Sequence, residues 1–135
     1  MAALFEGRQS IYVEGLGHGT QPIPDACRIG SILWSGGVSG VGADGRLPEQ
    51  VESEVTQMFV NLKAVLHAGG ATFADVIRMS VFAADRVQCR EPLNRCWLES
   101  FPEAHSRPAR HLMEQVLPGG MRVQCEVVAV IGEPR

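Results

Sequence analysis

The chain is poor in several features that define large classes of proteins. Aromatic residues make up 6% of its 135 residues, and 12 Lys and Arg are outnumbered by 15 Asp and Glu, which gives a net charge of −3. Nucleic-acid-binding proteins normally carry a basic patch or stacking aromatics, so we expect no nucleic-acid partner. No segment approaches the roughly 20 apolar residues of a membrane helix, so we expect no membrane association.

Cysteine is also scarce, and its spacing excludes the common cysteine motifs. The four cysteines are far apart and form no Cys-x-x-Cys pair; they are Cys27, Cys89, Cys96 and Cys125. The first residues include Glu6 and lack the apolar stretch of a signal peptide. Because disulfide frameworks belong mainly to secreted proteins, we expect free thiols, a cytoplasmic location and an inert core position for Cys125.

The remaining composition is typical of one globular domain. Apolar residues make up 45% of the chain, which is enough for a single core. The length favours one domain over residues 1–135, and we expect residues 1–20 to be loosely ordered. Residues 15–20 are rich in glycine, but no Gly-Lys-Ser/Thr follows. We therefore exclude a phosphate-binding loop and expect His18 to be exposed.

Periodic apolar residues predict two helices. Apolar side chains recur every three or four residues over residues 51–66, with Pro48 in the expected first turn and the glycines at 69–70 ending the helix. A second, shorter helix is expected over residues 92–101, preceded by a loop that begins at residues 85–86.

Alternating residues and turn signals predict the strands, which are expected at residues 26–29, 31–35, 76–83, 110–115 and 123–131. The apolar run at residues 32–34 is typical of a strand that is covered on both faces. The last two strands are expected to form a terminal hairpin across a turn at residues 117–120, where glycine permits positive φ. Together these elements predict an α+β fold, with two helices on one face of a mixed sheet.

Arg110 has the most specific setting of any polar side chain. Pro108 has a fixed φ and no N–H donor, and it favours an extended conformation at the residue before it. Arg110 therefore stands where a strand begins, beside a rigid turn, and its guanidinium offers a fixed fork of donors that suits a carboxylate. Strand alternation places Leu112 and Glu114 on the same face as Arg110.

Several short motifs occur along the chain in a characteristic order. They are Pro-Ile-Pro at 22–24, Trp-Ser-Gly at 34–36, Asn-Leu-Lys-Ala-Val-Leu at 61–66, Ala-Gly-Gly at 68–70, Arg-Pro-Ala-Arg at 107–110, Leu-Pro-Gly at 117–119 and Glu-Val-Val-Ala at 126–129. This set resembles the RidA family of enamine/imine deaminases, also called the YjgF or UK114 family, over about residues 20–131. Several motifs in one order are more specific than any single match.

The resemblance implies a chorismate-mutase-like fold that assembles as a homotrimer, with clefts between subunits. It implies that Arg110 grips the carboxylate of a small-molecule substrate, and that Ser35 and the backbone near Gly36 line the same cleft. No cofactor is expected. His105 and His111 lie across a Pro-containing turn with a spacing that matches no known ligand pattern, so we expect no metal site.

The chain departs from the family pattern at the residue that activates water. Where the family's archetypes carry a glutamate, this chain has Gln124, which can orient water but cannot take up a proton near neutral pH. Glu126 matches the family's second acidic residue and shares a strand face with Gln124. Either Glu126 or Glu114 supplies the missing carboxylate, or both are solvated or interface residues. Leu112 replaces a cleft cysteine.

Three functions follow as hypotheses. The first is hydrolytic deamination of small reactive enamine or imine acids, 2-aminoacrylate-like or aminomuconate-like, to a 2-oxo acid and ammonia, with water held by Gln124 or Glu126. The second is a non-catalytic trimer that binds a small carboxylate metabolite and regulates a partner, which would explain the missing base. The third is an endoribonuclease, for which the charge and the few aromatics offer little.

Overall fold

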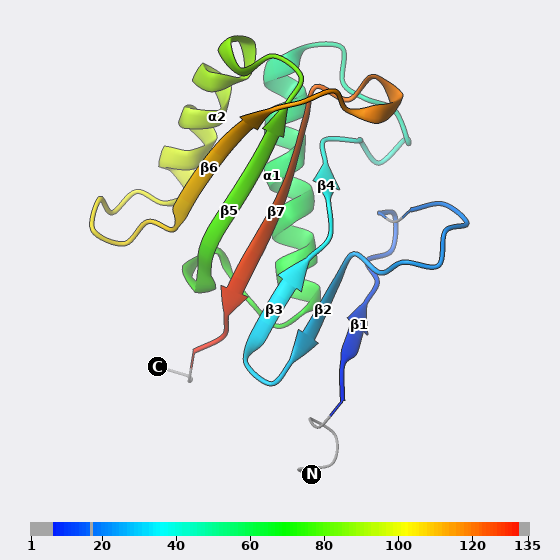
Figure 1. Ribbon diagram of the computed structural model, residues 1–135, viewed down its shortest axis with the longest axis vertical. Coiled ribbons are helices and arrows are strands. Elements are labelled where there is room, and N and C mark those ends of the chain that lie inside the picture. Colours follow the sequence, from blue (N-terminus) through cyan, green and yellow to red (C-terminus); the bar gives the residue numbers. More distant parts are fainter. Residues whose placement is uncertain (1–6, 17, 133–135) are drawn as a thin grey trace.

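The computed structural model describes residues 7–16 and 18–132, which form one seven-stranded sheet with two helices on one face (Figure 1). The elements are β1 (Gln9–Ile11), β2 (Ala26–Ile29), β3 (Ile32–Ser35), β4 (Val38–Ser39), α1 (Val51–Ala68), β5 (Val76–Ala83), α2 (Arg86–Ser100), β6 (Ala109–Glu114) and β7 (Val123–Val130). The strand order is β1-β2-β3-β7-β5-β6, and β4 pairs with β7. Only β5 and β6 pair in parallel among these strands, which confirms the predicted α+β class with a mixed sheet. β1 lies within the first 20 residues, where we expected loose order.

The prediction of a terminal hairpin is wrong, because β6 and β7 do not pair with each other. β5 lies between them, parallel to β6 and antiparallel to β7. Parallel strands need a long crossover connection, and α2 provides it between β5 and β6. The turn before β7 does have the expected positive φ, 66° at Gly119 and 77° at Gly120. A turn signal reports the local path of the chain and not the hydrogen-bond partner of the next strand.

Helix α1 begins later than the sequence pattern predicted. Its first residue is Val51, and Pro48 lies outside the helix. The carbonyl of Pro48 accepts a hydrogen bond from the guanidinium of Arg122, a long-range contact that fixes the segment before the helix. The predicted end is confirmed, because Gly69 is the C-cap and Gly70 has a φ of 83°.

Helix α2 begins earlier than predicted, at Arg86, so residues 86–91 are helical and not part of the loop that we expected. The Asp85 side chain is the N-cap and accepts hydrogen bonds from two backbone N–H groups of the first turn. Pro92 favoured a later start because proline is commonest in the first turn of a helix. In the structure Pro92 is buried within α2.

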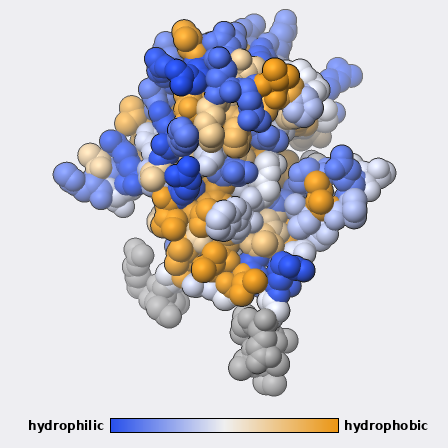
Figure 2. Space-filling model, viewed as in Figure 1, coloured by the Kyte–Doolittle hydropathy of each residue, from blue (hydrophilic) through white to orange (hydrophobic). Residues whose placement is uncertain are grey.

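The two faces of the sheet differ in their cover. Leu33 on β3 and Met79 on β5 are completely buried beneath the helices. On the opposite face Ile32 and Trp34 are 51% and 58% exposed, so the prediction that residues 32–34 are covered on both faces fails within one chain. We call the side of the sheet that the two helices leave uncovered the open face. Figure 2 shows apolar surface gathered over the lower part of the open face.

An irregularity in β5 changes which way its first residues point. The register shifts between Val76 and Arg78, so Val76 is buried and Ile77 is 53% exposed, opposite to what regular alternation along residues 76–83 predicts. A bulge adds one residue and reverses the alternation on one side of it. From Arg78 onward the pairing with β7 is regular, and Met79 lies on the helix face.

The structure also shows the state of the cysteines. All four cysteines are free, and Cys125 is completely buried on the helix face of β7. Burial raises the pKa of the Cys125 and Cys89 thiols, which agrees with an unreactive core role for Cys125.

Over the described residues, neither helix combines the length and apolarity that a membrane crossing requires.

Candidate functional site

Arg110 is the second residue of the edge strand β6, close to the strand start as predicted. Its register partner on β5 is the buried Met79, so the Arg110 side chain points to the helix face. There its guanidinium carbon lies 4.9 Å from the centre of the Trp97 ring on α2. A cation over an indole face is attracted by the ring, and this contact restricts where the guanidinium can lie.

The guanidinium of Arg110 is only partly satisfied by its surroundings. Its Nη1 atom is buried and has no hydrogen-bond partner among the described residues. Burial lowers the pKa of this side chain. An unpaired buried donor costs free energy, and a carboxylate that accepts from it would recover that cost. The site therefore holds a desolvated donor without an acceptor in the part of the chain that the structure describes.

Leu112 and Glu114 share the face of Arg110, as predicted, because they pair with Val81 and Ala83 of β5. Leu112 packs against the hydrophobic core. Glu114 is exposed, and its Oε1 accepts a hydrogen bond of 3.0 Å from the backbone N–H of Arg86. Since Arg86 is the first residue of α2, the Glu114 carboxylate already stabilises the positive end of that helix.

The Ser35 hydroxyl and the Gly36 N–H form hydrogen bonds to backbone groups within the fold. The Ser35 hydroxyl is buried; it accepts from the backbone N–H of Val127 at 2.8 Å and donates to the carbonyl of Gly36 at 2.9 Å. The N–H of Gly36 donates to the carbonyl of Asp25 at 2.9 Å. A Cβ at Gly36 would meet its nearest neighbour at 3.5 Å, an ordinary contact. Both residues thus connect β3 to neighbouring backbone, and the Ser35 hydroxyl and the Gly36 N–H already have acceptors among the described residues.

Gln124 and Glu126 share the open face of β7, as the alternation predicted, and both are partly exposed. Gln124 pairs with Ser39 of β4, and Glu126 pairs with Ser80 of β5. Gln124 also lies against Gly37, where an added Cβ would come within 2.6 Å of its Nε2 atom. The absence of a side chain at Gly37 therefore makes room for the Gln124 amide.

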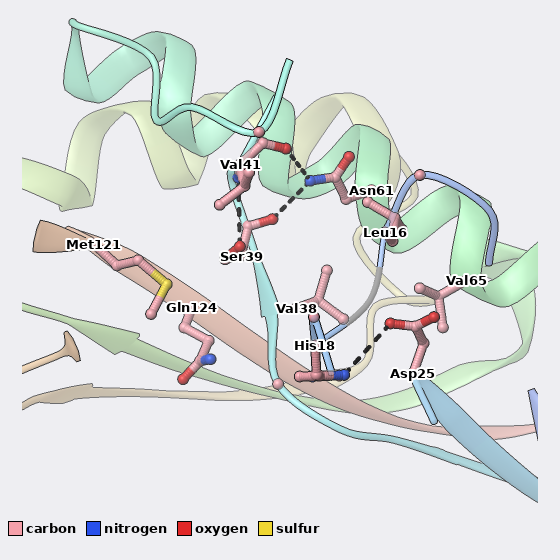
Figure 3. Close-up of a pocket in the computed structure, with 14 residues that line it drawn as sticks. Leu16, His18, Asp25, Val38, Ser39, Val41, Asn61, Val65, Met121 and Gln124 are labelled. Carbon is pink, nitrogen blue, oxygen red and sulfur yellow. Dashed lines mark hydrogen bonds and ion pairs between the residues drawn. The ribbon is translucent and has the colours of Figure 1, made fainter. Parts of the chain in front are cut away.

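Gln124 lines a pocket of about 650 Å³. The pocket is lined by residues 15, 16, 18 and 19, by β4 and the loop after it, by α1 and by the start of β7 (Figure 3). Asn61 on α1 secures the β4 wall, because its amide donates to the carbonyls of Ser39 and Val41, each at 2.9 Å. The pocket thus has a fixed wall on one side and the Gln124 amide on another.

His18 also lines this pocket, contrary to the expectation that it is exposed. Its side chain is 24% exposed, and its Nδ1 lies 3.9 Å from Oδ1 of Asp25. Asp25 is buried, and its Oδ2 accepts a 2.8 Å hydrogen bond from the backbone N–H of Val13. Sequence reasoning missed this pair. The glycine-rich stretch around His18 was the available signal, but it indicated only a loop.

One chain does not bring Arg110 and Gln124 together. Arg110 is on the helix face of β6, Gln124 is on the open face of β7, and β5 separates the two strands. The pocket that Gln124 lines does not include Arg110, Ser35 or Glu126. A site that uses both Arg110 and Gln124 therefore needs a second copy of the chain.

The structure defines a class of protein, an α+β chain with a mixed sheet, two helices on one face and an arginine at the sheet edge. The family model described as Endoribonuclease L-PSP matches residues 20–131. The chain belongs to this family, which is the RidA or YjgF family that the motifs indicated.

Relatives and solved structures agree with this membership. A RutC family protein of Aquifex aeolicus is 27% identical over 111 residues, covering 81% of this chain and 88% of the relative. The 2-iminobutanoate/2-iminopropanoate deaminase of Escherichia coli K12 is 28% identical over 101 residues, covering 73% and 78%. The crystal structure of RidA from the Antarctic bacterium Psychrobacter sp. matches with a TM-score of 0.81 at 24% identity, covering 91% and 99%, which supports the fold.

Proposed function

We propose that the protein is a hydrolase that deaminates small reactive enamine or imine acids, 2-aminoacrylate-like or aminomuconate-like, to 2-oxo acids and ammonia. The observation that carries this proposal is the desolvated, unpaired guanidinium of Arg110 over Trp97. Two E. coli relatives are named 2-iminobutanoate/2-iminopropanoate deaminase and putative reactive intermediate deaminase TdcF. A 2-imino acid carries its carboxylate next to the C=N bond, and a guanidinium fork suits that group.

Arg110 binds the substrate carboxylate and so fixes the position of the adjacent imine carbon. An enamine substrate first becomes the imine by moving a proton from nitrogen to carbon. Water held by the Gln124 amide then attacks the imine carbon, and ammonia leaves as the 2-oxo acid forms. Imines hydrolyse in water unaided, so positioning the carbon and the water supplies a useful part of the rate enhancement.

The site forms between copies of the chain, with Arg110 of one copy facing the Gln124 pocket of another, in a homotrimer. The opposite faces of Arg110 and Gln124 within one chain support this arrangement. The exposed Ile32 and Trp34 support it too, since they pair across strands with Val130 and Val128 and form apolar surface on the open face.

Sedimentation equilibrium is expected to give three times the mass of one chain, and the Trp34→Glu variant is expected to sediment as a single chain. A carboxylate in the centre of a buried apolar interface costs several kcal/mol, which is enough to separate the subunits. Val87→Glu is the matched control, because Val87 is 78% exposed on α2, away from the open face. A wild type that sediments as a monomer would contradict the inter-subunit site.

Turnover is tested with 2-aminoacrylate generated from serine by a serine dehydratase, with pyruvate as the readout. The wild type is expected to form pyruvate at least about tenfold faster than the spontaneous reaction, a modest part of what positioning can supply. Propionate is expected to inhibit competitively, whereas the uncharged propionamide is not, because only the carboxylate pairs with Arg110. Pyruvate formation at the spontaneous rate would rule out the deaminase.

A second candidate is a non-catalytic trimer that binds a small carboxylate metabolite and regulates a partner. Gln124 favours it, because a neutral amide cannot accept a proton from water. Thermal stabilisation by propionate without any acceleration of pyruvate formation would support this candidate. An endoribonuclease, although named in the family description, gains little from a net charge of −3 and 6% aromatic residues.

A further inference from the structure

Hydrolysis of an imine requires a group that takes a proton from the attacking water. The Gln124 amide cannot do so near neutral pH. Among the described residues that line the Gln124 pocket, the titratable side chains are those of His18 and Asp25. Neither of the other two candidate carboxylates lines this pocket. Glu114 accepts a hydrogen bond from the N–H of Arg86, and Glu126 is absent from the pocket lining.

Asp25 is the less suitable of the two acceptors. It is 6% exposed, and one of its carboxylate oxygens receives the backbone N–H of Val13. The other oxygen faces Nδ1 of His18. A buried carboxylate with these neighbours is suited to orient a histidine and to stabilise its charged form, as in other catalytic pairs of a carboxylate and a histidine.

We infer that His18, oriented by Asp25, is the general base that replaces the family's glutamate in this chain. The inference rests on the proposed deaminase function and names the proton acceptor of that site. His18 Nδ1 is buried, faces Asp25 at 3.9 Å and has no hydrogen-bond partner among the described residues. A proton on Nδ1, directed to the carboxylate, leaves Nε2 as the acceptor. Figure 3 shows His18 and Gln124 at the same pocket.

The distance between His18 and Asp25 is longer than a hydrogen bond. Hydrogen bonds of catalytic groups are often long in the absence of substrate and shorten when it binds. The Nδ1–Oδ1 distance of 3.9 Å exceeds an N–H···O hydrogen bond by roughly 1 Å, a gap that substrate binding can close. The backbone of Asp25 is held on both sides, because its N–H donates to the carbonyl of Ile11 and its carbonyl accepts from the N–H of Gly36.

The proton transfers balance with no further reagent. Water oxygen bonds to the imine carbon, the C=N π pair moves to nitrogen with a proton from solvent, and the proton of the water passes to Nε2 of His18. The Asp25 carboxylate stabilises the resulting imidazolium. The imidazolium then protonates the amino group, the C–N bond breaks, and ammonia leaves as the remaining hydroxyl loses its proton and the C=O bond forms.

The test compares kcat and KM for 2-aminoacrylate in His18→Gln, in Gln124→Glu and in the double variant. His18→Gln is expected to lower kcat about 100-fold with little change in KM, because general-base catalysis is typically worth 100-fold or more. The double variant is expected to recover most of the lost kcat, since the carboxylate introduced by Gln124→Glu restores an acceptor at the same pocket. His67→Gln, on the exposed last turn of α1, is the matched control and is expected to match the wild type.

Each outcome decides the inference. A His18→Gln variant with the wild-type kcat would overturn it and leave the deaminase intact. A loss confined to KM, or a loss of kcat that Gln124→Glu does not restore, would also overturn it, because His18 would then bind substrate or support the loop. A wild type without turnover would overturn both the inference and the proposed function. Circular dichroism and thermal melting of each variant separate loss of the fold from loss of the base.

Discussion

Arg110→Ala is expected to lower kcat/KM for 2-aminoacrylate by at least about 100-fold. The fork offers two charge-assisted hydrogen bonds of roughly 1.5–3 kcal/mol each, and every 1.4 kcal/mol is a factor of ten. The fold is expected to survive, because Arg110 lies on an edge strand and its Nη1 has no partner within the described residues that would be left unpaired. The serine dehydratase assay measures the loss, and thermal melting checks the fold.

Two variants make the Arg110 result specific. Arg95→Ala removes an exposed guanidinium from α2 and is expected to leave kcat/KM unchanged. Arg110→Lys keeps the charge but loses the planar fork, so it is expected to fall between the wild type and Arg110→Ala. If Arg110→Ala and Arg95→Ala behave alike, Arg110 does not bind the substrate and the proposed function loses the observation that carries it.

Glu54→Ala is expected to lower the free energy of unfolding by about 3 kcal/mol, the largest stability effect that we predict. Glu54 on α1 is completely buried and accepts from the backbone N–H of Arg122 at 2.8 Å and from its guanidinium. The Arg122 guanidinium also donates to the carbonyls of Pro48 and Glu49. Removing the carboxylate leaves the donors of Arg122 without their charged partner where β7 meets the start of α1. Urea denaturation measures the change.

Glu52→Ala is the matched control for Glu54→Ala. Glu52 is in the same first turn of α1 but is exposed, so its removal is expected to change stability by no more than about 0.5 kcal/mol. Glu54→Gln retains one oxygen for the Arg122 N–H but turns an amide donor toward a guanidinium, and it is expected to be intermediate. Equal stability of Glu54→Ala and Glu52→Ala would show that the buried pair contributes nothing.

Local patterns were sufficient for the features that depend on neighbouring residues. Strand alternation placed Arg110 with Leu112 and Glu114, and Gln124 with Glu126, on shared faces, because successive side chains of a strand point to opposite sides. The glycines at 69–70 ended α1 as predicted. The order of short motifs was enough to indicate the family, and the family model then matched residues 20–131.

Errors in the prediction arose where a local sequence pattern was compatible with two different structures. Pro92 marked a helix, but the Asp85 cap determined its start. The turn before β7 was recognised, but β5 occupies the place between β6 and β7 that a hairpin would have closed. The pairing partner of a strand depends on the crossover through α2, which no short window of sequence contains.

Alternation and helical periodicity, which act over a few residues, were enough to determine the α+β class of this protein and the strand face that Arg110 shares with Leu112 and Glu114. Contacts between distant parts of the chain depended on the folded molecule. These include Arg110 over Trp97, Glu54 with an arginine 68 residues away, and His18 with Asp25 at the Gln124 pocket. The physical reason is range: backbone preference and side-chain period are properties of adjacent residues, whereas burial and partnership arise only when packing brings separate segments together.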